Sequence, residues 1–175
     1  MIQVRVATEH DFAAYGQLLV ESYSQLPGFP GPEQQPQYYQ MLSQVGQFTR
    51  QPGVQIFVAE TESGQVCGGV LYFADMAHYG SGGTAASYRR ASGIRLLAVD
   101  AACRGRGIGE QLTRRCIDEA NSRGHQVMLL HTTAAMQSAW RLYQRLGFER
   151  FSDIDFTQVS MPVFGFRLHL AQEQQ

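Results

Sequence analysis

Residues 104–110 combine glycines and arginines at a spacing that suits the binding of an anion. The segment, RGRGIGE, follows an apolar stretch and precedes residues with helical periodicity. The first amides of a helix lack intrahelical acceptors and lie at the positive end of the helix dipole, so the backbone alone can hold an anion there. Glycines let a ligand approach closely, and arginines match phosphate oxygens. The segment therefore predicts a diphosphate site formed by Arg104, Gly105, Arg106, Gly107, Ile108, Gly109 and Glu110.

Two common nucleotide-binding motifs do not fit this segment. A Walker loop needs lysine followed by serine or threonine after its last glycine, and Glu110 stands there instead. A dinucleotide fingerprint needs G-x-G-x-x-G, whereas this sequence reads G-x-G-x-G and lies late in the chain. A glycine-rich turn with solvated arginines is the structural alternative.

Composition and charge limit the class of protein. The chain has 175 residues and a formal net charge of −1, so no overall charge favours nucleic acid or an anionic membrane. Cys67, Cys103 and Cys116 form no C-x-x-C pair, which argues against a disulfide framework and a zinc site. No segment has the length of a signal-peptide core or a membrane span. We expect one cytoplasmic domain over residues 1–175, with no metal, nucleic-acid or membrane partner.

The first half of the chain alternates between strand and helix patterns. Residues 2–7 alternate as a strand, and Thr8 with Asp11 offers a helix start. Four prolines in residues 26–36 end that helix before a second short one. The strand-like runs that follow, 54–60 and 66–74, are joined by a glycine-containing link and predict a hairpin, with a bulge at Gly68 and Gly69. Residues 75–92 predict a long functional loop.

The second half predicts a parallel pair of strands with a helical crossover. A buried strand over 94–99, a helix over 108–123 and a buried strand over 127–132 follow in order. A further helix over 136–146 ends at Gly147, and strands near 148–154 and 163–170 complete a mixed sheet. The fold class is therefore α/β (α+β).

The sequence resembles the GNAT-type N-acetyltransferases from about Ile94 to Phe148. Arg104, Gly107 and Gly109 match the fixed places of that family's acetyl-CoA signature. A second similarity lies in SAWRLYQRLGF, where the matching residues are Ala139, Leu142, Tyr143, Leu146, Gly147 and Phe148. One departure is Met136, where many members carry asparagine. The resemblance implies the GNAT fold: a mixed sheet of about seven strands and about four helices, with a parallel pair splayed at the cofactor site.

The resemblance also implies an enzyme and its co-substrate. Acetyl-CoA would lie with its diphosphate on residues 104–110 and its pantetheine arm beside Leu97, Ala98 and Val99, near Met136, Ala139 and Tyr143. The acetyl group would pass to an amine-bearing small molecule or peptide by direct attack in a ternary complex, and a homodimer is compatible with the family. A non-catalytic acyl-CoA-binding module and an enzyme for longer acyl groups are the alternatives.

Three side chains are candidates for proton transfer. The backbone N–H of Leu97 or Ala98 would polarise the acetyl carbonyl, and Tyr143 would protonate the departing thiolate. Because register places Gly93 where some relatives carry a glutamate base, His131 and Glu60 are the candidates for the base. Each has a structural alternative: a packed aromatic for Tyr143, a hydrogen-bonded histidine for His131 and a solvated carboxylate for Glu60.

Overall fold

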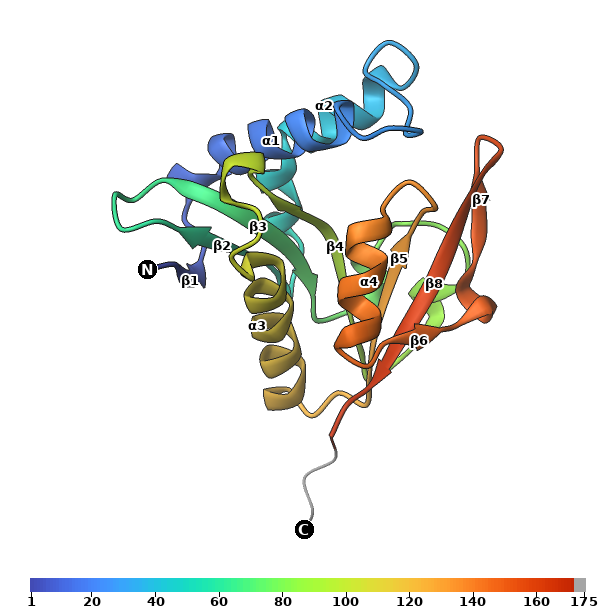
Figure 1. Ribbon diagram of the computed structural model, residues 1–175. Coiled ribbons are helices and arrows are strands. Elements are labelled where there is room, and N and C mark those ends of the chain that lie inside the picture. The colour runs from blue at the N-terminus through green and yellow to red at the C-terminus, as the bar shows by residue number, and fades with distance from the viewer. Residues whose placement is uncertain (172–175) are drawn as a thin grey trace. The chain divides into compact units, whose positions relative to one another are not determined.

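The computed structural model describes residues 1–171 and contains a mixed sheet and α-helices (Figure 1). The strands follow the hydrogen-bonding order β1-β2-β3-β4-β5-β8-β6, with β7 paired to β8. The parallel pair β4–β5 within this sheet confirms the predicted fold class. The strands are β1 (Gln3–Val6), β2 (Val54–Glu60), β3 (Val66–Phe73), β4 (Ala91–Val99), β5 (Val127–Thr132), β6 (Glu149–Arg150), β7 (Phe156–Gln158) and β8 (Met161–His169). The α-helices are α1 (Glu9–Ser24), α2 (Pro36–Ser43), α3 (Ile108–Ser122) and α4 (Gln137–Arg145).

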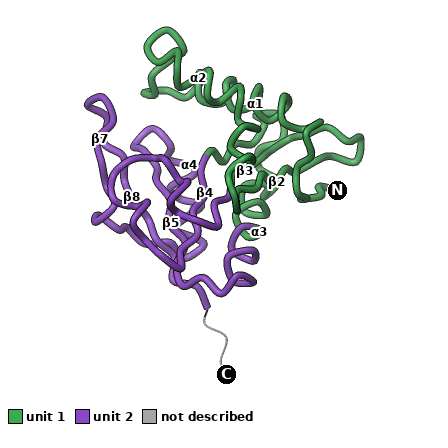
Figure 2. Tube along the Cα trace, turned by 180° about the vertical axis from the view of Figure 1, so that it is seen from behind, with its two compact units in different colours: residues 1–71, 96–115 green, residues 72–95, 116–175 purple. Residues whose placement is uncertain are grey.

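The chain divides into two compact units, which are described separately (Figure 2). Unit 1 comprises residues 1–71 and 96–115, and unit 2 comprises residues 72–95 together with the described residues from 116 onward. Strands β3 and β4 and helix α3 each contribute residues to both units. The expectation of one domain over residues 1–175 stays a prediction.

In unit 1, local sequence signals set the helix ends. The Thr8 N–H donates to the Asp11 carboxylate at 2.8 Å, so α1 begins where the capping pattern predicts. Helix α2 begins at Pro36, whose missing N–H costs nothing in the first turn. Tyr39 and Leu42 on α2 are buried.

Gly68 and Gly69 in β3 are explained by close packing on both faces of the strand. A Cβ at Gly68 would lie 3.0 Å from Ile108 Cγ2 of α3, and one at Gly69 would lie 2.8 Å from Tyr15 Cδ1 of α1. Successive strand residues face opposite sides, so each glycine lets one helix approach the sheet.

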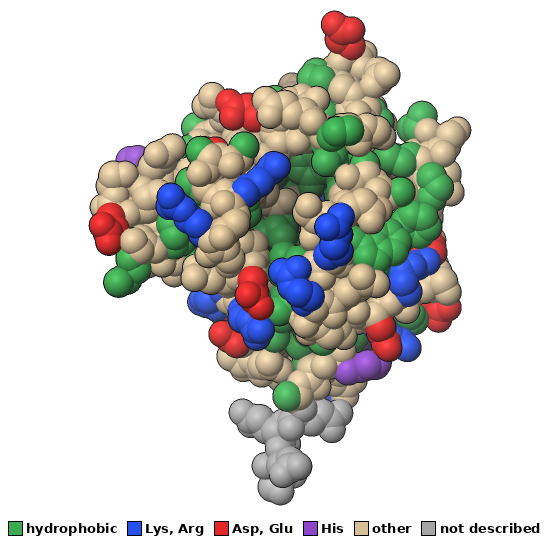
Figure 3. Space-filling view, in the orientation of Figure 1, with side chains coloured by type: hydrophobic (Ala, Val, Ile, Leu, Met, Phe, Trp, Pro, Cys, Tyr) green, Lys and Arg blue, Asp and Glu red, His purple; other side chains and the backbone are tan. Residues whose placement is uncertain are grey.

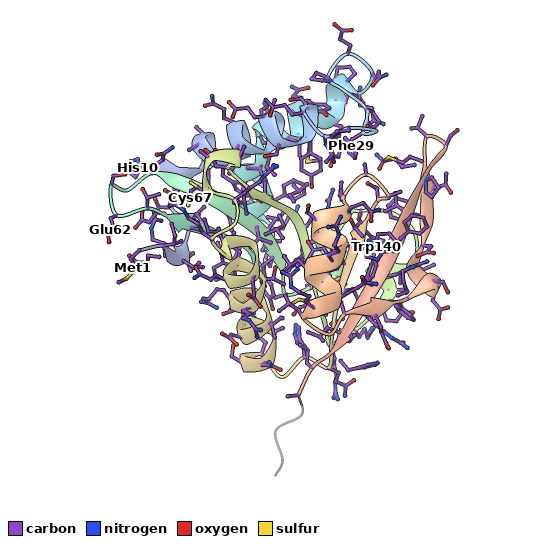
Figure 4. The ribbon with its side chains drawn as sticks, in the orientation of Figure 1. Met1, His10, Phe29, Glu62, Cys67 and Trp140 are labelled. Carbon is purple, nitrogen blue, oxygen red and sulfur yellow. The ribbon has the colours of Figure 1, made fainter. Side chains whose placement is uncertain are left out.

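In unit 2, β5 is paired on both sides. It runs parallel to β4 and antiparallel to β8, where Thr132 lies opposite Phe164 and Leu130 opposite Phe166. Trp140 of α4, labelled in Figure 4, packs edge-on against both phenylalanines, with ring centroids 5.3 Å and 4.9 Å apart. Helix α4 therefore covers this face of β5 and β8.

The structure corrects two of the predicted elements and adds a strand that the sequence pattern missed. Strand β4 begins at Ala91, inside the predicted loop, because Ala91 pairs with Val127 of β5. The strand predicted near 148–154 is limited to β6, and the chain then turns through Ser152–Ile154 into β7, which the sequence pattern missed. The turn has a physical reason. Asp155 Oδ1 accepts a hydrogen bond of 2.6 Å from the Gly165 N–H, so a side-chain oxygen takes the place of a carbonyl from a paired strand.

Candidate functional site

The glycine-rich segment 104–110 leads into α3 in unit 1 and leaves its amides available. None of its backbone N–H groups donates to an acceptor among the described residues, and the first amide beyond it, that of Gln111, donates to Gly107 O at 3.0 Å. Arg104 and Arg106 are exposed, and arginines are among the surface side chains of the face drawn in Figure 3. The segment therefore has the free donors and the positive charge that a diphosphate requires.

Two glycines fix the backbone shape of this segment. Gly105 and Gly107 have φ values of 83° and 74°, in the left-handed region that other residues rarely adopt. A Cβ at either position would meet nothing within 4 Å. The need for glycine at both positions is therefore conformational, and the space above them is open to a ligand.

Strand β4 has an irregular residue at Leu96, just before the predicted pantetheine-binding residues 97–99. Leu96 is buried and has a φ of 60°, which is uncommon for a side chain of this size. Its carbonyl accepts a hydrogen bond of 2.6 Å from the buried Tyr15 hydroxyl of α1, also in unit 1. Tyr15 therefore holds the backbone that presents Leu97 and Ala98. Sequence reasoning missed this role, because Tyr15 lies in an ordinary apolar helix stripe and nothing local marks Leu96.

In unit 2 the pairing of β4 with β5 stops early. Registered pairs run from Ala91–Val127 to Gly93–Leu129, although β5 continues to Thr132. Among the described residues, no β4–β5 pair is registered beyond Gly93–Leu129. The splay at the cofactor site stays a prediction, because β4 from Leu96 onward belongs to unit 1 and β5 to unit 2.

Tyr143 lies on α4 in unit 2 and is buried, with an exposed fraction of 5 %. Its ring packs against Phe148 with centroids 5.6 Å apart, and its hydroxyl has no hydrogen-bond partner among the described residues. Burial raises the pKa of the phenol well above its ordinary value, and the neighbouring Tyr79 and Cys116 raise it further. The hydroxyl thus keeps its proton at neutral pH and can direct it to a ligand.

His131 of β5 has both ring nitrogens occupied. Nδ1 lies 2.9 Å from the Tyr79 hydroxyl, and Nε2 lies 2.7 Å from the Ile154 carbonyl. This pairing assigns the proton to Nε2, because a carbonyl only accepts. Burial lowers the pKa of His131, which favours the neutral imidazole. The sequence missed Tyr79 as this partner, because it comes from the loop between β3 and β4.

Glu60 is the other predicted base and lies in unit 1. Its carboxylate accepts a hydrogen bond of 2.9 Å from Arg5, which also binds both oxygens of Asp11 at 2.7 Å and 3.0 Å. The Arg5 guanidinium lowers the pKa of Glu60. A carboxylate held in this way is a weaker base than a free one.

The remaining predicted site residues are also divided between unit 1 and unit 2. Leu97, Ala98 and Val99 lie in unit 1 with residues 104–110, whereas Met136 and Ala139 lie with Tyr143 and His131 in unit 2. Met136 precedes the first residue of α4 and is half-buried. Among residues 1–171, no three His, Cys, Asp or Glu side chains gather as a metal site would require, and no helix is long and apolar enough to cross a membrane.

Two curated relatives match part of this chain. N-acetylaspartate synthetase of Danio rerio is 38% identical over 69 residues, which are 39% of this chain and 24% of the relative. N-alpha-acetyltransferase 30 of Schizosaccharomyces pombe is 38% identical over 58 residues, 33% of this chain and 39% of the relative. The matches thus span less than half of either relative.

Solved structures share the fold over nearly the whole chain. An acetyltransferase of the GNAT family from Staphylococcus aureus Mu50 aligns with a TM-score of 0.74 at 14% identity, covering 98% of this chain and 100% of that one. The yncA protein of Salmonella typhimurium, solved with its cofactor acetyl-CoA, aligns with a TM-score of 0.69 at 21% identity, covering 100% of this chain and 97% of that one.

Sequence comparison with protein families agrees with the two motifs. The family model described as "Acetyltransferase (GNAT) family" matches residues 16–148, a range that contains the free amides of residues 104–110, the irregular Leu96 and the helix that carries Tyr143. The chain therefore belongs to the GNAT acetyltransferase family.

Proposed function

We propose that this protein transfers an acetyl group from acetyl-CoA to an amine by direct attack in a ternary complex. The observation that carries the proposal is the free backbone N–H groups of residues 104–110, flanked by exposed Arg104 and Arg106. Membership of the GNAT acetyltransferase family supports it, as does the fold shared with yncA, which was solved with acetyl-CoA.

The backbone of unit 1 would hold the cofactor and polarise its reacting carbonyl. Bound acetyl-CoA supplies an acetyl thioester, whose carbonyl carbon an amine nitrogen can attack. The amides of residues 104–110 bind the diphosphate, and residues Leu97 to Val99 lie along the pantetheine arm. The Leu97 or Ala98 N–H donates to the carbonyl oxygen, and the Tyr15–Leu96 hydrogen bond fixes the direction of that donor.

Tyr143 would serve as the general acid for the departing sulfur. Its hydroxyl makes no hydrogen bond to a described residue, and its raised pKa keeps the proton in place until transfer. A thiol has an ordinary pKa of about 8.5 and a phenol one of about 10, and burial raises the pKa of Tyr143 further, so the transfer is more uphill than the ordinary values indicate. The proton therefore has to move together with the departure of the sulfur.

His131 is the better of the two base candidates. It is neutral at physiological pH because burial lowers its pKa, whereas Glu60 is held by Arg5. A base role requires Nδ1 to receive the amine proton directly, in place of Tyr79, or through the Tyr79 hydroxyl. His131 also fits a purely structural role, and a His131→Asn variant separates the two by the pH dependence of kcat/KM.

The acceptor we propose is an amine on a small molecule or at a peptide N-terminus. The names of the two relatives point to these two types: N-acetylaspartate synthetase to an amino acid, and N-alpha-acetyltransferase 30 to an α-amine. The test is release of free thiol from acetyl-CoA in the presence of a broad panel of amines and peptides. Turnover with an amine supports the proposal, whereas acetyl-CoA binding without thiol release would favour a binding module. Faster release of free thiol from a longer acyl-CoA than from acetyl-CoA would favour an acyltransferase for longer acyl groups.

A further inference from the structure

Unit 2 contains a chain of three hydrogen-bonded side chains that the proposed function does not use. The Tyr72 hydroxyl of β3 lies 2.7 Å from Ser92 Oγ of β4, and Ser92 Oγ lies 2.6 Å from Nδ1 of His125. Tyr72 and Ser92 are both 0 % exposed, whereas His125 is half-buried. The chain therefore runs from a buried hydroxyl to a partly exposed imidazole.

Only one member of this chain changes its charge near neutral pH. A serine next to a histidine can be a nucleophile with its base, but Ser92 has no exposed surface that a substrate could reach. Burial raises the pKa of Tyr72 to about 12, so the phenol keeps its proton. His125 is therefore the group whose protonation can alter the chain between pH 5 and pH 8.

The protonation state of His125 decides the direction of the hydrogen bonds. When neutral His125 carries its proton on Nε2, Nδ1 accepts from Ser92 and Ser92 Oγ accepts from Tyr72, so two hydrogens serve two hydrogen bonds. Protonated His125 has a hydrogen on both nitrogens, so Nδ1 must donate to Ser92 Oγ. Three hydrogens then compete for two positions, and one buried hydroxyl hydrogen has to leave the chain. The hydrogen-bond count therefore favours neutral His125.

The charged groups that face His125 act on the same equilibrium. Burial lowers the pKa of His125, and the positive charge of Arg123, just after α3, lowers it further. Asp75, which follows β3, acts in the opposite direction and raises it. Arg123 also forms an ion pair of 3.1 Å with Glu119 of α3. The lowered pKa agrees with the hydrogen-bond count, since both favour the neutral imidazole.

The segment around His125 joins several elements of unit 2. The His125 N–H donates to Ala120 O of α3 at 3.1 Å, and the Gln126 N–H donates to Arg90 O, just before β4, at 2.7 Å. The Leu170 N–H, just after β8, donates to Gln126 O at 2.9 Å. A change at His125 therefore acts where the ends of α3, β4 and β8 are held together.

We propose that the Tyr72–Ser92–His125 chain is a pH-sensitive latch, which holds the segment after α3 against β3 and β4 while His125 is neutral and loosens it when His125 is protonated. The latch lies within unit 2 and does not depend on the proposed function. Because the pKa of His125 is lowered in the folded protein, the latch stabilises the fold above the ordinary value of 6.5, and this contribution is lost as pH falls below 6.5.

The first test is an NMR titration of the His125 ring in the wild type and in Ser92→Ala. The variant keeps the histidine and removes its hydrogen-bond partner. We expect a pKa below 6.5 in the wild type and a value closer to 6.5 in Ser92→Ala, because alanine does not donate to the neutral imidazole.

The second test is the protection of the Gln126 amide against hydrogen exchange, corrected for the intrinsic effect of pH. We expect protection to fall at least about fivefold from pH 7 to pH 5 in the wild type, which corresponds to the loss of one hydrogen bond. His125→Asn should remove most of this fall, because asparagine offers an accepting oxygen but does not titrate. His10→Asn, at an exposed position on α1, is the matched control and should follow the wild type.

Two results would overturn the inference. One is a His125 pKa at or above 6.5 in the wild type, a measurement that needs no variant to fold. The other is a His125→Asn variant in which Gln126 protection falls with pH as steeply as in the wild type. Neither result bears on the proposed function, which is tested by the release of free thiol from acetyl-CoA.

Discussion

At the scale of single residues, hydrogen-bond partners separate the candidates for proton transfer. The Tyr143 hydroxyl has no partner among the described residues, whereas His131 has two and Glu60 is bound by Arg5. A group without a protein partner can turn toward a ligand at no cost in hydrogen bonds. This difference favours Tyr143 as the residue that acts directly on the reacting atoms.

We expect Tyr143→Phe to lower kcat by about a hundredfold, in the range of general acid catalysis, with little change in the Kd of acetyl-CoA. Phenylalanine keeps the ring contact with Phe148, so Tm should stay close to that of the wild type. Steady-state kinetics and calorimetry on the same preparation measure the two effects. An unchanged kcat would remove Tyr143 from the mechanism.

At the scale of elements, unusual backbone conformations shape the candidate site. Gly105 and Gly107 have positive φ in the segment before α3, and Leu96 has it within β4. Glycine adopts a positive φ easily, whereas leucine needs contacts with its surroundings to stay in this conformation. The hydroxyl of Tyr15 supplies part of that support through Leu96 O.

Gly107→Ala is expected to weaken acetyl-CoA binding by about tenfold, because alanine disfavours this φ by about 1–2 kcal/mol and shifts the loop. Gly64→Ala is the matched control: Gly64 has a φ of 85° in the turn between β2 and β3, and its Cβ would also meet nothing within 4 Å. Both variants should lose similar stability, but only Gly107→Ala should lose affinity. Equal affinities in calorimetry would contradict the role of residues 104–110.

Tyr15→Phe removes the hydrogen bond to Leu96 O and should lower kcat several-fold, with a loss of stability of about 1 kcal/mol. Tyr39→Phe provides the comparison, because it removes a similar bond of 2.7 Å to Pro30 O. We expect both variants to unfold at lower denaturant concentrations than the wild type. A kcat that falls equally in both would show that Leu96 has no special role.

At the scale of the whole molecule, positive charge is unevenly distributed along the sequence. The formal net charge is −1, yet residues 6–49 contain no arginine or lysine, whereas residues 104–115 contain Arg104, Arg106, Arg114 and Arg115. The anion binding that we propose for residues 104–110 therefore depends on local charge, and a nearly neutral total does not oppose it. At the N-terminal end, Arg5 is held by Asp11 and Glu60 and joins β1, α1 and β2.

The Arg5 network predicts how stability depends on acid. Arg5 lowers the pKa of Asp11 from 3.8 to about 2, so this carboxylate stabilises the fold above pH 3.8 and the contribution is lost as pH falls toward 2. We expect Asp11→Asn to unfold more easily than the wild type at pH 7 and to lose less stability between pH 4 and pH 2. Asp118→Asn, at an exposed position on α3, should follow the wild-type profile in thermal unfolding.

Much of this architecture is readable from the sequence because its signals are local. The Thr8–Asp11 cap, Gly147 after α4 and the periodicity of the buried strands give the correct order of elements from β1 to α4. Errors occur where a distant contact decides the structure. The turn before β7 depends on Asp155 reaching Gly165, and the early start of β4 depends on pairing with β5.

The sequence by itself showed the family resemblance and predicted residues 104–110 and Tyr143 as site residues, because glycine positions and motif spacing can be recognised along the chain. Only the tertiary structure decided the strained Leu96 with its Tyr15 support, the Tyr79 partner of His131 and the hydrogen-bonded chain that ends at His125. Each of these is defined by residues far apart in sequence. Long-range contacts leave no pattern in composition or periodicity, because they follow from how strands and helices pack in three dimensions.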